Sequence, residues 1–68
     1  MSVGEKIKEY LQSAGISQKW LCEKTGISIP KMNLTLNGNR KLTFEEYEVI
    51  CWALNLNTDR FITPRAPQ

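Results

Sequence analysis

The side chains best suited to chemistry in this sequence are cations grouped in its middle third. Between Ile16 and Leu42 there are five cations and one anion, Glu23, and three glutamates follow within residues 45–48. The cations are Lys19, Lys24, Lys31, Arg40 and Lys41. Because Lys and Arg bind phosphates, this segment has the charge distribution of a phosphate-binding surface. A solvated helical face would show a similar excess, so charge alone leaves both interpretations open.

Groups for catalysis or metal binding are sparse. The chain has no His and no Ser, Cys or carboxylate set at a spacing typical of hydrolysis or acid–base catalysis. Cys22 and Cys51 occupy small apolar positions, and without His they cannot complete a structural zinc site in one molecule. We therefore expect two reduced core cysteines in a binding protein that is not an enzyme. We expect no metal, no cofactor and no small-molecule ligand.

The cations surround two short predicted helices that are separated by a glycine turn. Ser17 is a favourable N-cap for a helix over about 17–25, and Gly26 stands where that helix must end in a residue that tolerates positive φ. Ser28 can cap a second helix over about 28–36. Two helices at this spacing form a helix-turn-helix, whose second helix can enter the major groove of DNA.

Further helices are predicted on both sides of this motif. Ser2 and Glu5 have capping-box spacing, and apolar residues then recur at helical intervals until Gly15. Thr43 and Glu46 form a second capping box. The helix after it has an expected core face of Phe44, Tyr47, Ile50, Cys51 and Leu54, with Asn55 as its C-cap.

The end of the sequence predicts a return to the core and then a tail. Residues 58–62 suggest a turn or short fifth helix that brings Leu56 and Phe61 inward, and Pro64 and Pro67 predict a flexible tail over 63–68. With no alternating strand pattern, the chain is predicted to be all-α, a compact bundle of four to five short helices in one domain over residues 1–62. No apolar run approaches the roughly 20 residues of a membrane helix, so we expect a cytoplasmic location without a membrane partner.

The sequence resembles the lambda-repressor-like helix-turn-helix family, which includes phage Cro proteins, phage repressors and small bacterial regulators. The resemblance runs without gaps from about Ile7 to Phe61. It is carried by the segments at 15–18, 21–22, 26–28, 37–41 and 50–57. It implies sequence-specific binding of double-stranded DNA by a homodimer on a palindromic operator. Because a single small domain must dimerise through its own surface, we expect weak self-association that tightens on DNA. A Cro-like repressor is the leading prediction.

The resemblance also assigns roles to individual side chains. Base contacts would come from the second helix of the motif, through Ser28, Ile29, Pro30, Lys31, Asn33 and Leu34. Contacts to the DNA backbone would come from Gln18, Lys19, Asn37, Asn39, Arg40 and Lys41. Gln18 would in addition support side chains of the recognition helix.

The recognition helix departs from the family pattern, because Ile29, Pro30 and Leu34 lack hydrogen-bonding side chains. Asn33 can pair with adenine and Lys31 can reach guanine, whereas Ile and Leu can only pack on thymine methyl groups. We therefore expect a sparse, partly apolar readout that uses DNA shape. The alternative is a protein-binding face, which would make the chain an antirepressor or adaptor.

Five further residues have no assigned contact with DNA. Val49, Trp52 and Leu56 are a candidate interface for a second copy or another partner, although Trp52 could instead lie flat on its own domain. Trp20 is expected to face outward beside Lys19. It could line the DNA backbone, but a structural role at the junction of the first two helices is favoured. Thr35 replaces a buried aliphatic residue of the family, and its hydroxyl is expected to bond to the carbonyl oxygen of Lys31.

Overall fold

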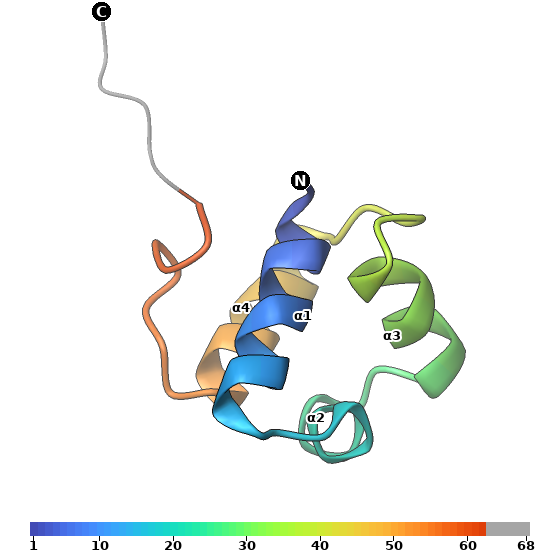
Figure 1. Ribbon diagram of the computed structural model, residues 1–68, viewed down its shortest axis with the longest axis horizontal. Helices are drawn as coiled ribbons and strands as arrows, with labels where there is room; N and C mark the ends of the chain where they lie inside the picture. The colour runs from blue at the N-terminus through green and yellow to red at the C-terminus, as the bar shows by residue number, and fades with distance from the viewer. Residues whose placement is uncertain (63–68) are drawn as a thin grey trace, which may run out of the picture.

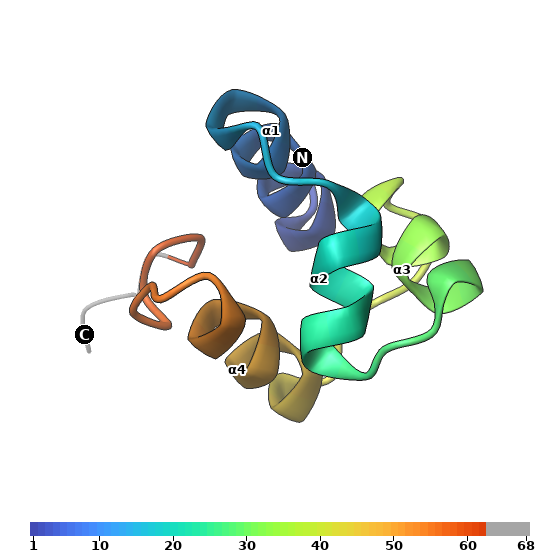
Figure 2. The same cartoon turned by 90° about the horizontal axis from the view of Figure 1, so that it is seen from below.

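Four α-helices joined by short turns form the described part of the chain, residues 1–62, in the computed structural model (Figure 1). They are α1 (Val3–Ala14), α2 (Gln18–Thr25), α3 (Ile29–Leu36) and α4 (Phe44–Ala53). Helix α3 packs against α1, and α2 packs against both α3 and α4. Figure 2 shows α2 lying between α3 and α4. The predicted all-α fold and both helices of the motif are confirmed, while the tail predicted at 63–68 lies outside the described residues.

Apart from the end of α4, the helices begin and end at the residues that the sequence indicates. Ser2 and Thr43 each accept a hydrogen bond from the backbone N–H three residues on, and Glu5 and Glu46 reach back to complete the two capping boxes. Gly15 and Gly26 end α1 and α2 with φ of 71° and 77°, a left-handed conformation that glycine adopts without steric cost. Local hydrogen bonding therefore defines the helix boundaries.

One core holds the four helices together. Its buried apolar side chains are Ile7, Leu11, Leu21, Cys22, Met32, Leu36, Tyr47, Ile50, Cys51, Leu54 and Phe61. Residues 57–60 form a turn rather than a fifth helix, and they return Phe61 to the core, where its ring meets that of Tyr10 edge to face. Leu56 packs partly buried against the same core, as predicted. Burial raises the pKa of both cysteine thiols, so Cys22 and Cys51 are free thiols of low reactivity.

The end of α4 nearest α1 differs from the prediction. Phe44 was expected in the core, yet 69% of it is exposed. It is the first residue of α4, and side chains there point back toward the helix N-terminus, past the packed part of the helix. Val3 and Leu42 cover the core at this end instead. At the other end Leu54 caps the helix, and Asn55, the expected cap, follows it with a φ of 58°.

Helices α1 and α3 meet at a glycine. Gly4 is buried, and a Cβ placed on it would lie 1.9 Å from the carbonyl oxygen of Thr35. Only a residue without a side chain lets the two backbones approach this closely. The same carbonyl accepts a hydrogen bond from the N–H of Gly38 at 3.1 Å, which starts the turn after α3. The first turn of α1 therefore positions the end of α3.

Candidate nucleic-acid interface

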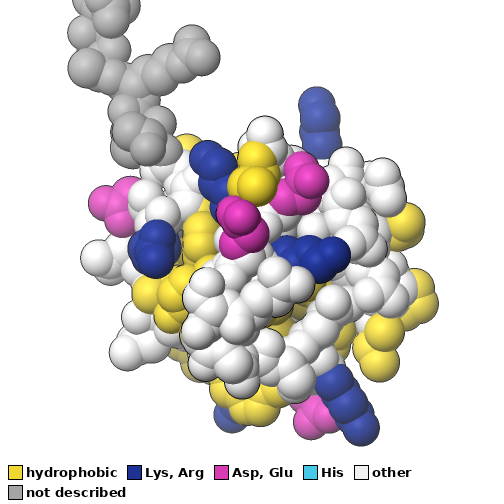
Figure 3. Space-filling view, viewed as in Figure 1, with side chains coloured by type: hydrophobic (Ala, Val, Ile, Leu, Met, Phe, Trp, Pro, Cys, Tyr) yellow, Lys and Arg dark blue, Asp and Glu magenta, His cyan; other side chains and the backbone are white. Residues whose placement is uncertain are grey.

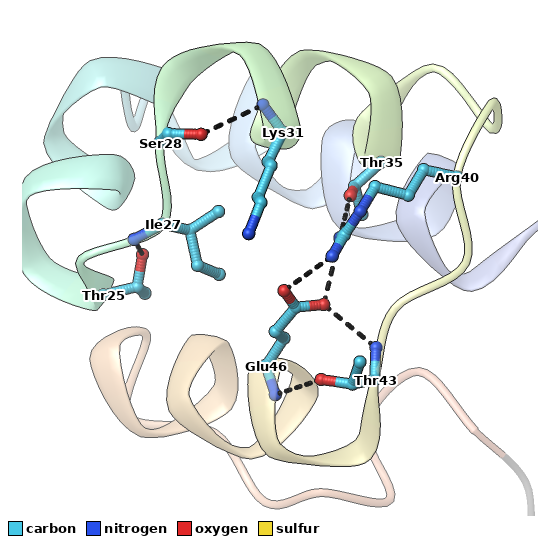
Figure 4. A network of polar contacts seen from close by, with 8 residues as sticks. All are labelled: Thr25, Ile27, Ser28, Lys31, Thr35, Arg40, Thr43 and Glu46. Carbon is cyan, nitrogen blue, oxygen red and sulfur yellow. Dashed lines mark hydrogen bonds and ion pairs between the residues drawn. The ribbon is translucent and has the colours of Figure 1, made fainter.

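The outer side of α3 is exposed and largely apolar. All six residues predicted to contact bases are exposed, while Met32, Thr35 and Leu36 face the core. Ile29 is 52% exposed and Leu34 is 48% exposed. Hydrophobic side chains gather along the edge of the molecule over α3 (Figure 3). Lys31 is exposed too, but Figure 4 shows its side chain extending from α3 toward the side on which α4 lies.

The start of α2 is bonded to the middle of α3. Gln18 is the first residue of α2, and its Nε2 donates a hydrogen bond to Oδ1 of Asn33. This contact matches the supporting role that the family resemblance implied for Gln18. It holds both side chains at the exposed junction of the two helices of the motif, next to Lys19, which is exposed as well.

The end of α3 is bonded to α1 through a lysine that the sequence did not single out. Nζ of Lys8 donates to Oδ1 of Asn37 at 2.7 Å, on the molecular surface. Asn37 was predicted to contact the DNA backbone, whereas Lys8 was not. The two residues are 29 positions apart. No local spacing rule connects Lys8 and Asn37, so their contact could not be predicted from the sequence and is seen only once α1 is packed on α3.

Arg40 holds the loop after α3 onto α4. Its guanidinium donates to both carboxylate oxygens of Glu46, at 3.0 and 2.8 Å, and to Oγ1 of Thr35 at 3.1 Å (Figure 4). Oγ1 of Thr35 is the acceptor in the bond from Arg40, and the expected bond from the Thr35 hydroxyl to the carbonyl oxygen of Lys31 is not formed among the described residues. Hydrogen bonds from Arg40 and then from the backbone N–H of Thr43 lower the pKa of Glu46 to about 2.

The remaining predicted contacts to the DNA backbone differ from Arg40 in their surroundings. Lys19, Asn39 and Lys41 are exposed, whereas the Arg40 side chain is only 25% exposed and is committed to an ion pair. Arg40 shares its charge with Glu46, so its field toward solvent is weaker than that of the exposed lysines. Within the predicted set, the free positive charge of the loop therefore lies on Lys41.

The tryptophans lie at two separate places. Trp20 of α2 is 39% exposed, and Nζ of Lys24 lies 5.6 Å from the centre of its ring, a cation–π contact. Trp52 of α4 is 73% exposed, so the alternative in which it lies flat on its own domain is wrong. Together with Val49 and Leu56 it lines a shallow hollow on α4. The three residues predicted as an interface are thus brought together.

Comparison with known proteins gives one result. A family model described as Cro/C1-type HTH DNA-binding domain matches residues 6–62. No curated protein and no solved structure matches the chain. Within residues 1–62, none of the helices has the length and apolar character needed to cross a membrane. The matched range contains all of α2, α3 and α4 and most of α1.

Proposed function

Because the chain belongs to the Cro/C1-type helix-turn-helix family of DNA-binding domains, we propose that it is a sequence-specific transcriptional repressor that acts as a homodimer on a palindromic operator. The observation that carries the proposal is the exposed outer side of α3, held between α1 and α2 and flanked by exposed lysines. Occupation of an operator by such a domain represses transcription by excluding the polymerase.

Base recognition in this proposal is mostly apolar. Ile29 and Leu34 are each about half exposed, and in the major groove they pack on thymine methyl groups. Pro30 adds rigid shape at the start of the helix, while Ser28 donates or accepts one hydrogen bond. Few hydrogen bonds to base edges make the protein depend on sequence-dependent DNA shape as well.

Contacts to phosphates supply most of the affinity. Lys19 and Lys41 are exposed cations near opposite ends of the motif, and Asn37 and Asn39 add amide donors in the loop. Each lysine that neutralises a phosphate releases condensed counterions, so binding weakens as salt rises. Arg40 acts mainly through the loop that it anchors on Glu46 and Thr35.

The homodimer forms through α4. Val49 and Trp52 expose apolar surface around a hollow that the half-buried Leu56 also lines, and a two-fold axis would bring this surface against itself. The patch is small, so self-association is weak in the free protein. It tightens on DNA because two half-sites hold the protomers together.

A protein-interaction module, such as an antirepressor or adaptor, is the second candidate. The observation that favours it is the same apolar surface of α3, since Ile29, Pro30 and Leu34 would also suit a protein partner. In this case the lysines beside α3 would contribute little to binding.

Binding of the purified protein to a pool of duplexes with a randomised centre, measured by fluorescence anisotropy at rising salt, tests the proposal. We expect affinity to fall steeply with salt and Lys41→Ala to reduce the slope of log K against log salt by about 1. Leu34→Asp should abolish selective binding, and Leu34→Met is the matched apolar control. Absence of binding at low salt would overturn the proposal in favour of a protein partner.

A further inference from the structure

Asn33 in α3 and Asn37, the C-cap of α3, each accept a hydrogen bond from a side chain of another helix. Asn33 Oδ1 accepts a hydrogen bond from Gln18 of α2, and Asn37 Oδ1 accepts one from Lys8 of α1. All four side chains lie at the surface or are half-buried there. The two helices that precede α3, α1 and α2, thus each donate to the oxygen of one of these asparagines.

The orientation of each amide determines what it offers to a ligand. An asparagine side chain has one acceptor oxygen and one NH2 group with two donors. In both pairs the oxygen points to its neighbour within the protein, so the NH2 group is left for an external partner. Gln18 Nε2 retains a second N–H, and Nζ of Lys8 has three protons, of which one is used. Apart from Oε1 of Gln18, which is an acceptor, the unused groups of the two pairs are therefore donors.

A row of donors with one cation fits an anion. A phosphate oxygen accepts hydrogen bonds and donates none, and each nucleotide of a DNA strand carries one phosphate. Residues at i and i+4 on a helix are about 5–6 Å apart at Cβ. That spacing is comparable to the separation of adjacent phosphates along one strand.

We propose that Asn33 and Asn37, supported by Gln18 and Lys8, form a donor track that binds two consecutive phosphates of one DNA strand. Asn33 then positions the backbone instead of reading a base, and Lys8 of α1 joins the phosphate contacts. The inference rests on the proposed DNA-binding function. Glu5 lies near Lys8 and lowers the net charge there, while its carboxylate accepts the N–H of Ser2 in the capping box. The donors of the track are the two asparagine NH2 groups and the Lys8 ammonium.

Neighbouring lysines of α1 provide a matched test. Lys8 belongs to the track, whereas Nζ of Lys6 lies 3.4 Å from the carbonyl oxygen of Phe61, on a different side of the molecule. Lys8→Ala and Lys8→Gln should each reduce the salt slope of DNA binding by about 1, because each removes one phosphate-neutralising charge. Lys6→Ala should leave the slope unchanged. Equal slopes for the Lys6 and Lys8 variants would overturn the track.

Asn33→Ala separates a phosphate contact from a base contact. Binding-site selection from randomised duplexes should return the wild-type preferences, with affinity reduced by a similar factor for every sequence, since phosphate contacts carry no sequence information. Relaxed preference at one base position would show that Asn33 reads a base and would overturn the proposal. Circular dichroism confirms that each variant is folded. A wild-type protein that binds DNA while these variants behave like the controls refutes the track alone, and a wild-type protein that binds no duplex refutes the proposed function as well.

Discussion

Replacing Gly4 by alanine should destabilise the domain, although alanine is the better helix former. In an ordinary helix interior the change would stabilise by about 0.5–1 kcal/mol. Here the new Cβ would lie 1.9 Å from the carbonyl oxygen and 2.8 Å from the carbonyl carbon of Thr35, and both are backbone atoms that cannot rotate away. Relieving the contact requires α1 and α3 to separate by about 1 Å, since non-bonded heavy atoms need over 3 Å between them.

The loss of folding stability in Gly4→Ala can be estimated from the known cost of overpacking. Overpacking a core typically costs about 1–3 kcal/mol, and this is larger than the gain in helix propensity. For a domain of this size, each kcal/mol shifts the midpoint of thermal unfolding by about 4–8 °C, so we expect a decrease on the order of 5–20 °C. The Gly38 N–H bond to Thr35 would be disturbed as well, which would displace the loop after α3 and weaken DNA binding.

Thermal unfolding followed by circular dichroism measures the effect. Ser13→Ala, at an exposed site of the same helix, is the matched control and should be neutral or slightly stabilising. A Gly4→Ala protein as stable as the wild type would refute the inference that the α1–α3 contact depends on the missing side chain.

The remaining predictions concern charge, core and surface. The pKa of Glu46 is about 2 in the folded protein against an ordinary value of 4.5, so its ion pair stabilises fully above pH 4.5 and is lost as pH falls through 2. Urea unfolding should therefore show a smaller loss of stability between pH 4.5 and 2 in Glu46→Gln than in the wild type, and parallel profiles would contradict this. Met32→Ala removes a fully buried side chain of α3 and should cost about 2–5 kcal/mol in the same assay. Trp52→Ser should leave the unfolding temperature within a few degrees of the wild type and weaken self-association in sedimentation equilibrium, whereas unchanged association would place the dimer elsewhere.

Much of the fold follows from short-range rules. Serine and threonine caps, glutamates three residues later and glycines that tolerate positive φ lie close together in sequence, so the helix boundaries could be predicted. Phe44 shows the limit of helical periodicity. The periodic pattern continues through it, but the packed part of α4 does not extend to its first residue.

The sequence predicted which residues lie at the candidate site, but it did not predict which side chains they contact. The motif spacing indicated that Gln18, Asn33 and Asn37 would be near DNA, and the structure places all three at the surface. What each side chain contacts depends on tertiary packing. The ion pair of Arg40 with Glu46 and the hydrogen bond of Lys8 to Asn37 join separate elements, and no spacing pattern along the chain identifies either.

The exposure of Trp52 has an optical consequence. An indole that is 73% exposed on α4 emits from an aqueous environment, whereas Trp20 on α2 is 39% exposed and has a lysine ammonium near its ring. Pairing of two α4 surfaces would remove water from Trp52 and shift its emission to shorter wavelength, with reduced access for an added quencher. A Trp20→Phe protein would isolate this signal. Trp52 would thus be a label-free reporter of the proposed self-association, which can be read separately from the binding of DNA.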